Sequence, residues 1–133
     1  MKRILTIGVF DLLHFGHMEL FRKAKALGDH LTVAVQEADY VTKFKPGAKL
    51  TYTTEQRCYM VAAIRYVDEV VTYKTAEDIV QKVDFDIFAR GPDQTNPSFL
   101  AAEKWCGEHH RKVVVLPRTE GISTSLIKEI LKK

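Results

Sequence analysis

Five short apolar runs alternate with amphipathic stretches along this chain, and the alternation constrains the fold more than any other feature. The runs are rich in β-branched residues, have the length of strands and cover residues 3–9, 30–36, 67–73, 85–90 and 112–117. The stretches with helical spacing of apolar residues cover 16–27, 54–65, 76–82, 98–109 and 123–132. Strands that alternate with helices predict an α/β fold, in which a five-stranded parallel sheet carries helices on both faces.

Length and composition indicate one soluble domain. The 133 residues, 46% hydrophobic and 28% charged, can bury a sizeable core but not a second one, so we expect a single domain over residues 1–133. No apolar run approaches the ~20 residues of a membrane span, and the first residues lack a signal-peptide pattern, which predicts a cytoplasmic protein. Cys58 and Cys106 lack metal-ligand spacing. A net charge of +3, without a basic block interleaved with aromatic residues, argues against a nucleic-acid partner.

The stretch 37–53 is the least regular part of the chain and is expected to be a long connection. It carries Lys43, Lys45 and Lys49 and follows the second predicted strand. A loop of this length inside a compact domain is usually functional, and ligands of open α/β sheets bind beyond the carboxyl ends of the strands. The lysines therefore become candidate ligands for an anion, although simple solvation of a loop is the alternative.

The segment "GVFDLLHFGH", residues 8–17, places two histidines at the start of the first predicted helix. His14 and His17 are three residues apart, and Gly16 between them lets the backbone turn tightly or lets a ligand approach. A helix N-terminus offers free N–H groups and the positive end of the helix dipole, so we expect an anion to bind there. The alternative is one exposed histidine and one that caps or packs locally.

The segment "PRTEGISTSLIKEI", residues 117–130, repeats this arrangement after the last predicted strand. Gly121 supplies a turn, and Ser123 or Thr124 is suited to cap the final helix. Hydroxyl and backbone N–H groups at a helix start predict a second phosphate site, which would face the first across the end of the sheet. Capping without any ligand is the alternative.

These two segments resemble the signatures of the cytidylyltransferase family of nucleotidyltransferases, whose H-x-G-H motif binds a nucleoside triphosphate. The resemblance covers nearly the whole chain and is closest to the bacterial glycerol-3-phosphate cytidylyltransferases. It implies a Rossmann-like fold and an enzyme that transfers CMP from CTP to a small phosphorylated alcohol, releases pyrophosphate and makes an activated precursor for a surface polymer or lipid. It also implies a homodimer. The dinucleotide fingerprint G-x-G-x-x-G is absent, which argues against a nicotinamide-dependent dehydrogenase.

The resemblance implies roles for individual residues. His14 and His17 would contact the phosphates at the bond that changes, and Lys43 or Lys45 would neutralise phosphate charge. The residues implied to bind the nucleotide are Gly8, Val9, Phe10, Gly16, Gly91, Asp93, Arg118, Thr119, Gly121, Ile122, Ser123 and Thr124. Arg65 would hold the acceptor, and Arg57 would bind the acceptor or serve the structure. A Mg²⁺ ion would be held mainly by substrate phosphates, with no dedicated protein ligand.

Several alternatives stay open at this point. Arg57 and Arg65 lie eight residues apart on one predicted helix, where surface ion pairs would also explain them. Asp11 is either a turn residue or a distant, water-mediated contact of the metal.

The segments 36–40 and 89–99 depart from the relatives at the expected acceptor pocket. Val9 stands where relatives commonly have a hydroxyl-bearing residue, so one potential polar contact near the triphosphate is missing. Arg90, an added candidate acceptor contact, predicts a more acidic acceptor than glycerol 3-phosphate or a pair with a neighbouring carboxylate. The competing functions are adenylyl transfer from ATP and a catalytically silent nucleotide-binding module.

Overall fold

The computed structural model describes residues 1–92, 94 and 96–117, and their strands form one five-stranded sheet. The strands are β1 (Arg3–Gly8), β2 (His30–Gln36), β3 (Glu69–Tyr73), β4 (Ile87–Arg90) and β5 (Lys112–Val115). All neighbours pair in parallel, in the order β3-β2-β1-β4-β5. The predicted Rossmann-like α/β sheet is therefore confirmed.

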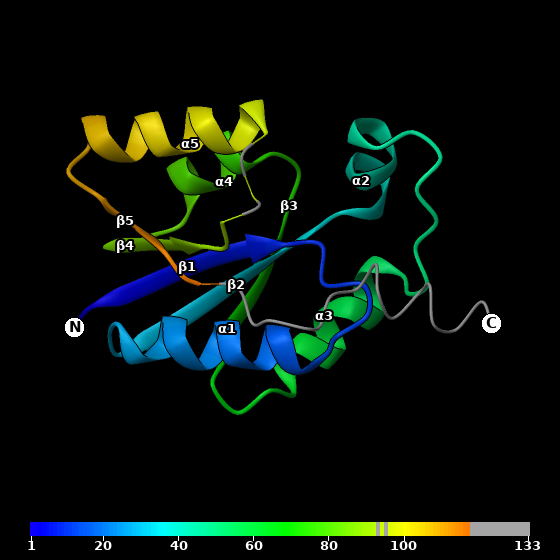
Figure 1. The fold of residues 1–133 in the computed structure, drawn as a ribbon, viewed down its shortest axis with the longest axis horizontal. Coiled ribbons are helices and arrows are strands. Elements are labelled where there is room, and N and C mark those ends of the chain that lie inside the picture. Colours follow the sequence, from blue (N-terminus) through cyan, green and yellow to red (C-terminus); the bar gives the residue numbers. More distant parts are fainter. Residues whose placement is uncertain (93, 95, 118–133) are drawn as a thin grey trace.

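Helices cover both faces of the sheet, as predicted. They are α1 (Phe15–Ala26), α2 (Ala38–Phe44), α3 (Thr54–Ala62), α4 (Ala76–Lys82) and α5 (Pro97–Glu108). Figure 1 shows α1 and α3 against one face and α4 and α5 against the other, with α2 beyond the carboxyl ends of the strands. The helix expected over 123–132 lies outside the described residues. Within the described part of the chain, no helix is long and apolar enough to cross a membrane.

The core is divided by the sheet into two hydrophobic clusters. Successive side chains of a strand point to opposite faces, so Leu5 and Ile7 of β1 join the cluster that contains Phe99 of α5. Ile4 of the same strand joins the other cluster, with Phe21 of α1. The strand β1 is thus buried on both faces and provides a rigid base for the loop that follows it.

The winding direction of the sheet reverses between β1 and β4. From β1 the chain proceeds to β2 and β3 on one side, and then crosses to β4 and β5 on the other. Ligands of open α/β sheets bind outside the carboxyl ends of the strands at such a reversal. The loops after β1, β2, β3 and β4 are therefore the place to look for a functional site.

The irregular connection expected over 37–53 contains a helix, so this prediction was wrong in part. Helix α2 occupies Ala38–Phe44. The Thr54 hydroxyl accepts a hydrogen bond from the Ala38 amide at 3.0 Å, and Asp39 in the first turn and Lys43 in the last turn suit the helix dipole. The cap comes from a residue that is distant in sequence, which local pattern reading does not detect.

The prediction that Arg57 and Arg65 share one helix was also wrong. Helix α3 ends at Ala62, with Ala63 as its C-cap. The next residues turn so that Ile64 and Val67 pack against the core before β3 begins. Arg65 therefore lies on the exposed turn after α3.

Candidate active site

His14 and His17 together cap the first turn of α1. The Gly16 amide donates to Nδ1 of His14 at 3.0 Å, and the His14 amide donates to Nδ1 of His17 at 3.3 Å. The two bonds form a reciprocal capping box, in which His14 is the N-cap and His17 the third helical residue. The spacing of three residues in the sequence is the spacing that such a box requires.

The capping bonds also select the tautomer of each imidazole. A ring nitrogen that accepts a hydrogen bond carries no proton, so in the neutral ring the proton is on Nε2. No described residue forms a hydrogen bond with Nε2 of either histidine. Both rings therefore keep an N–H donor for a ligand at the helix N-terminus. The rings stack with their centroids 3.9 Å apart.

Burial keeps these histidines neutral. Desolvation, together with the neighbouring His14, lowers the pKa of His17 to about 4. Desolvation also lowers the pKa of His14. The site therefore offers neutral N–H donors at neutral pH, and a bound polyphosphate would favour protonation by supplying negative charge.

The turn between β1 and α1 explains the glycine and the phenylalanine of the first motif. Phe10 has a φ of 53°, in the left-handed region, and its ring lies over Gly8. A Cβ atom at Gly8 would come within 2.8 Å of the Phe10 ring, so a larger residue does not fit without a shift of the ring. The edge of Phe10 also contacts His17, with centroids 5.4 Å apart. Gly8 and Phe10 thus position the catalytic candidate His17.

Arg57 connects the loops that follow β1 and β2. Its guanidinium donates to the carbonyls of Val9 at 2.9 Å, Gln36 at 2.8 Å and Tyr52 at 3.3 Å. The side chain is fully buried, and desolvation lowers the pKa of Arg57 although Asp11 opposes that effect. Of the two roles left open for Arg57, the structure shows the structural one.

Asp11 also connects two loops, as an acceptor of hydrogen bonds. Its carboxylate accepts hydrogen bonds from the backbone amides of Thr51 and Tyr52 at 2.9–3.0 Å. The loop before α3 is thereby attached to the loop after β1. These contacts match the interpretation of Asp11 as a turn residue that organises the backbone.

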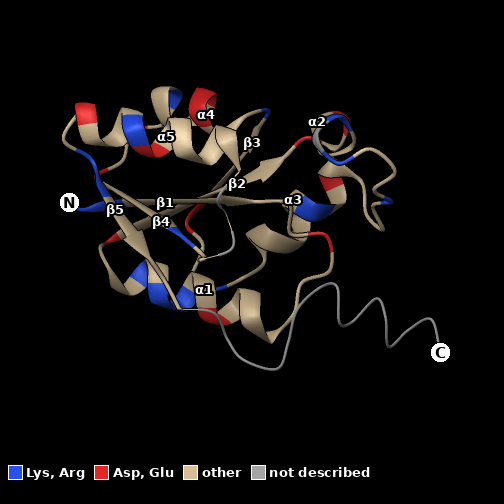
Figure 2. Ribbon diagram, turned by 45° about the horizontal axis from the view of Figure 1, so that its top comes forward, with Lys and Arg blue, Asp and Glu red and all other residues tan. Residues whose placement is uncertain are grey.

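Lys43 and Lys45 lie beside the carboxyl ends of the strands, as expected for phosphate ligands. Both are exposed; Lys43 lies in the last turn of α2, and Lys45 is its C-cap. The Lys43 ammonium group is 5.2 Å from the ring centre of Tyr40. Figure 2 shows basic residues on α2 and on the loop that follows it, which also carries Lys49.

Arg65 and Arg90 each have contacts of their own. Arg65 is exposed and lies over the ring of Tyr66 at 5.9 Å. Arg90 forms an ion pair with Glu103 of α5 and donates to the carbonyl of Gly91. The carboxylate partner that the sequence left open for Arg90 is thus present. Gly91 follows β4 and has open space where a Cβ would lie.

The second motif cannot be placed from this structure. Its predicted nucleotide ligands lie outside the described residues, as does the one expected after β4; they are Asp93, Arg118, Thr119, Gly121, Ile122, Ser123 and Thr124.

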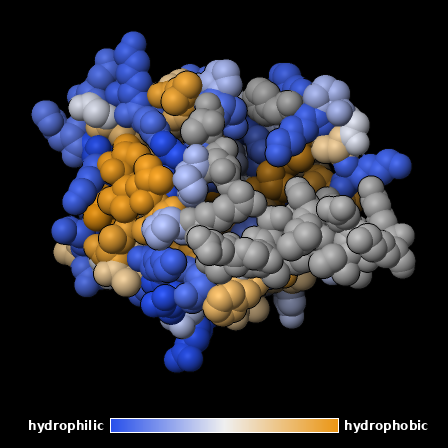
Figure 3. All heavy atoms as spheres, in the orientation of Figure 1, coloured by the Kyte–Doolittle hydropathy of each residue, from blue (hydrophilic) through white to orange (hydrophobic). Residues whose placement is uncertain are grey.

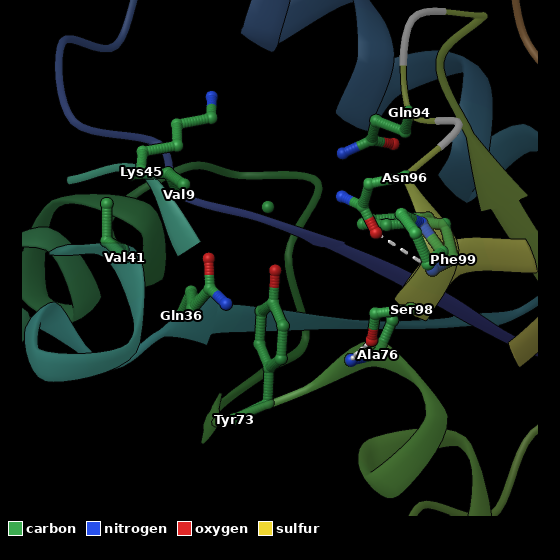
Figure 4. Close-up of a pocket in the computed structure, with 12 residues that line it drawn as sticks. Val9, Gln36, Val41, Lys45, Tyr73, Ala76, Gln94, Asn96, Ser98 and Phe99 are labelled. Atoms are coloured by element: carbon green, nitrogen blue, oxygen red, sulfur yellow. Dashed lines mark hydrogen bonds between the residues drawn. The ribbon is translucent and has the colours of Figure 1, made fainter. Parts of the chain in front are cut away.

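A cavity of about 580 Å³ lies at the carboxyl ends of the strands, and the two segments expected at the acceptor pocket supply part of its lining, including Gln36, Gln94 and Asn96. It lies between α2 on one side and α4 and α5 on the other, and the space-filling view shows a hollow with hydrophobic atoms at its bottom (Figure 3). Tyr73, Asn96 and Ser98 line it together with Val9 and Lys45 (Figure 4). Tyr73 was not predicted as a site residue. It is the last residue of β3, but an aromatic residue at that position is explained equally well by packing in the core.

His109 and Cys106, near the end of α5, have contacts within the protein. His109 stacks on Trp105, with ring centroids 4.2 Å apart, and its Nδ1 lies 2.9 Å from the Trp105 carbonyl. Cys106 is buried in the core, and burial raises its pKa to about 11. In the described part of the chain, no group of three or more histidine, cysteine or acidic side chains is arranged to hold a metal ion.

Known proteins that are similar to this chain include named cytidylyltransferases, which agrees with an anion site at the start of α1. A family model described as "Cytidylyltransferase-like" matches residues 5–130. The glycerol-3-phosphate cytidylyltransferase of Staphylococcus aureus is 43% identical and that of Bacillus subtilis 40% identical, over 98% and 97% of this chain and 96% of each relative. Among solved structures, a lipopolysaccharide core biosynthesis protein from Thermoplasma volcanium is 26% identical and superposes with a TM-score of 0.71, covering 90% of this chain and 97% of that one.

Proposed function

The chain belongs to the cytidylyltransferase-like family, and from that membership we propose that it transfers CMP from CTP to glycerol 3-phosphate or a closely related phosphorylated alcohol. The observation that carries the proposal is the paired histidine cap at the start of α1. Its two Nε2–H donors lie at a helix N-terminus beyond the central strand, in a chain that matches named cytidylyltransferases over almost its full length.

The reaction needs alignment and charge stabilisation more than a strong base. A phosphate oxygen of the acceptor, already ionised at neutral pH, attacks the α-phosphorus of CTP. The bond from that phosphorus to the oxygen bridging to the β-phosphate breaks, and its electron pair leaves with pyrophosphate. His14 and His17 donate hydrogen bonds to the phosphate oxygens on which negative charge increases, and the N-terminus of α1 adds its dipole. Lys43 and Lys45 reduce the repulsion between the two anionic substrates.

The remaining nucleotide contacts are proposed from the family resemblance. Gly8, Val9, Phe10 and Gly16 would border the triphosphate, since they form the turn that leads to the histidines. Gly91 and Asp93 after β4, and the segment from Arg118 to Thr124, would hold the cytidine and the outer phosphates. Arg65 would contact the acceptor.

A Mg²⁺ ion at this site would have the substrates as its ligands. The buried carboxylate closest in sequence to the histidines, Asp11, is engaged by backbone amides. The ion would therefore be held by phosphate oxygens and water, and it would supply charge neutralisation for the leaving pyrophosphate.

The test is pyrophosphate release from CTP or ATP, with glycerol 3-phosphate as acceptor and Mg²⁺ present. We expect release with CTP that depends on the acceptor, and a CDP-linked product. Exclusive use of ATP would overturn cytidylyl transfer in favour of adenylyl transfer. CTP binding without turnover of any acceptor would favour the silent module.

We further propose that the product is an activated precursor for a surface polymer or lipid, made in the cytoplasm by a homodimer. Light scattering after size exclusion tests the dimer, for which a mass of twice 15.2 kDa is expected.

A further inference from the structure

The cavity beside β1 has a polar wall with unused hydrogen-bonding capacity. The Tyr73 hydroxyl points into it, and no described residue binds that hydroxyl, although only 4% of the Tyr73 surface is exposed (Figure 4). Across the cavity, Asn96 uses its side-chain oxygen to accept from the Phe99 amide, which leaves its NH₂ group available. Ser98 accepts from the Ala76 amide at 3.0 Å and keeps its own O–H donor.

Gln36 completes this polar wall on the side of β2. Its side-chain nitrogen donates to the Lys74 carbonyl at 2.9 Å, so the side-chain oxygen remains as an acceptor toward the cavity (Figure 4). The four side chains thus present a hydroxyl, an amide NH₂, a second hydroxyl and an amide oxygen. Such a mixture of neutral donors and acceptors matches alcohol groups, each of which both donates and accepts.

Charge in the cavity is confined to one place. Among the described residues that line the cavity, Lys45 is the one with a charged side chain, and none of them carries a carboxylate. A ligand with a single anionic group near Lys45 and an uncharged, hydroxylated remainder suits this distribution. A ligand with an ammonium group would find no counter-charge among the lining residues.

The size of the cavity exceeds the needs of glycerol. A volume of about 580 Å³ falls in the range of roughly 300–1,000 Å³ that buries whole small-molecule ligands. Part of that space, beside Gly8 and Val9, is assigned to the nucleotide, and the wall formed by Asn96 and Ser98 lies beyond it and offers contacts to a carbon chain longer than that of glycerol. Gly8 and Val9 line the cavity and belong to the segment that leads to the histidine turn.

We propose that this cavity receives the carbon chain of the acceptor, and that the preferred acceptor is a straight-chain polyol phosphate longer than glycerol 3-phosphate. This inference rests on the proposed cytidylyl transfer and specifies its acceptor. Tyr73 is then a specificity-determining residue, which binds a hydroxyl group of the longer chain.

The experiment compares kcat/KM for glycerol 3-phosphate, erythritol 4-phosphate and ribitol 5-phosphate, at saturating CTP and Mg²⁺, by pyrophosphate release. We expect at least one of the longer acceptors to exceed glycerol 3-phosphate by about tenfold or more. Tyr73→Phe should reduce this preference about three- to tenfold, the effect of one hydrogen bond. It should not change the melting temperature, because the hydroxyl has no described protein partner. Tyr59→Phe is the matched control, since Tyr59 is 80% exposed on α3, and should leave the preference as it is.

The outcomes separate this inference from the function on which it rests. Preference for glycerol 3-phosphate, or a preference for longer acceptors that Tyr73→Phe does not alter, overturns the assignment of the cavity and leaves cytidylyl transfer standing. If no pyrophosphate is released with any of the three acceptors, cytidylyl transfer to a polyol phosphate is overturned, and the assignment of the cavity is overturned with it.

Discussion

Substituting His17 by asparagine separates the two tasks of this residue. His17 accepts the His14 amide through Nδ1 and leaves Nε2 as a donor. The side-chain oxygen of asparagine occupies nearly the position of Nδ1 in histidine, but asparagine has no atom at the position of Nε2. His17→Asn therefore keeps the capping acceptor and removes the group that we assign to catalysis.

The structure sets the expected magnitudes. The loss of the edge contact with Phe10, at 5.4 Å between centroids, costs about 0.5–1.5 kcal/mol of stability, and the retained cap limits any further loss. A domain with about 5–15 kcal/mol of stability stays folded at 25 °C after such a change. Removal of one donor to a transition-state oxyanion costs about 10²- to 10³-fold in rate. We therefore expect kcat to fall by that factor in a folded enzyme.

The assay is pyrophosphate release from CTP at saturating acceptor, together with thermal unfolding of the same preparations. His17→Ala should lose as much activity but more stability, because it also removes one of the two hydrogen bonds of the capping box, worth about 0.5–1.5 kcal/mol. His110→Asn is the control: His110 is exposed with a φ of 58°, a conformation that asparagine tolerates well. A His17→Asn enzyme with turnover within threefold of the unmodified protein would refute the catalytic role.

Three further predictions concern the framework of the site. Arg57→Ala leaves three backbone carbonyls without their donor and should destabilise the protein by about 3–5 kcal/mol, seen as a drop in melting temperature on the order of 10 °C; an unchanged melting temperature would contradict its structural role. Gly8→Ala, whose Cβ would meet the Phe10 ring at 2.8 Å, should lower kcat through displacement of His17, and full activity would show that the ring moves freely. The His17 pKa of about 4 lies below the ~6.5 of an unfolded histidine, so its contribution to stability is present above pH 6.5 and is lost as pH falls toward 4; the melting temperature of the unmodified protein should fall more over this range than that of His17→Asn, and equal falls would contradict the assignment.

The sheet could be predicted from the sequence because each strand is a compact apolar run. The strands β1, β2 and β3 are bounded by polar or glycine residues, and the first-turn motifs of α1 and α3 are local in sequence. The helix α2 could not be predicted in this way. Its first turn is completed by Thr54, and the benefit of that contact exists only after the chain has folded.

The site could be predicted only where a local motif concentrates the chemistry. His14 and His17 belong to one short motif, and the lysines follow one another closely in the chain, so both could be recognised in the sequence. The hydroxyl and amide groups of the cavity instead come from segments that follow three different strands. Tyr73, Gln36 and Asn96 are brought together by the register of β2 with β3 and by the turn into α5. The same limit applies to Arg90, whose partner Glu103 lies on a neighbouring helix.

The capping geometry gives a physical reason for the spacing of the two histidines. An imidazole has two nitrogens on opposite sides of the ring, so it can satisfy an orphan helix N–H with one and present a proton donor with the other. Serine or aspartate would cap the helix equally well, but aspartate would repel a polyphosphate and serine would not reach as far. A histidine at the N-cap and another three residues later therefore couple the formation of α1 to the orientation of two phosphate donors. A substitution that breaks the cap should disturb both donors at once, because each ring is oriented by a backbone group that the other histidine helps to position.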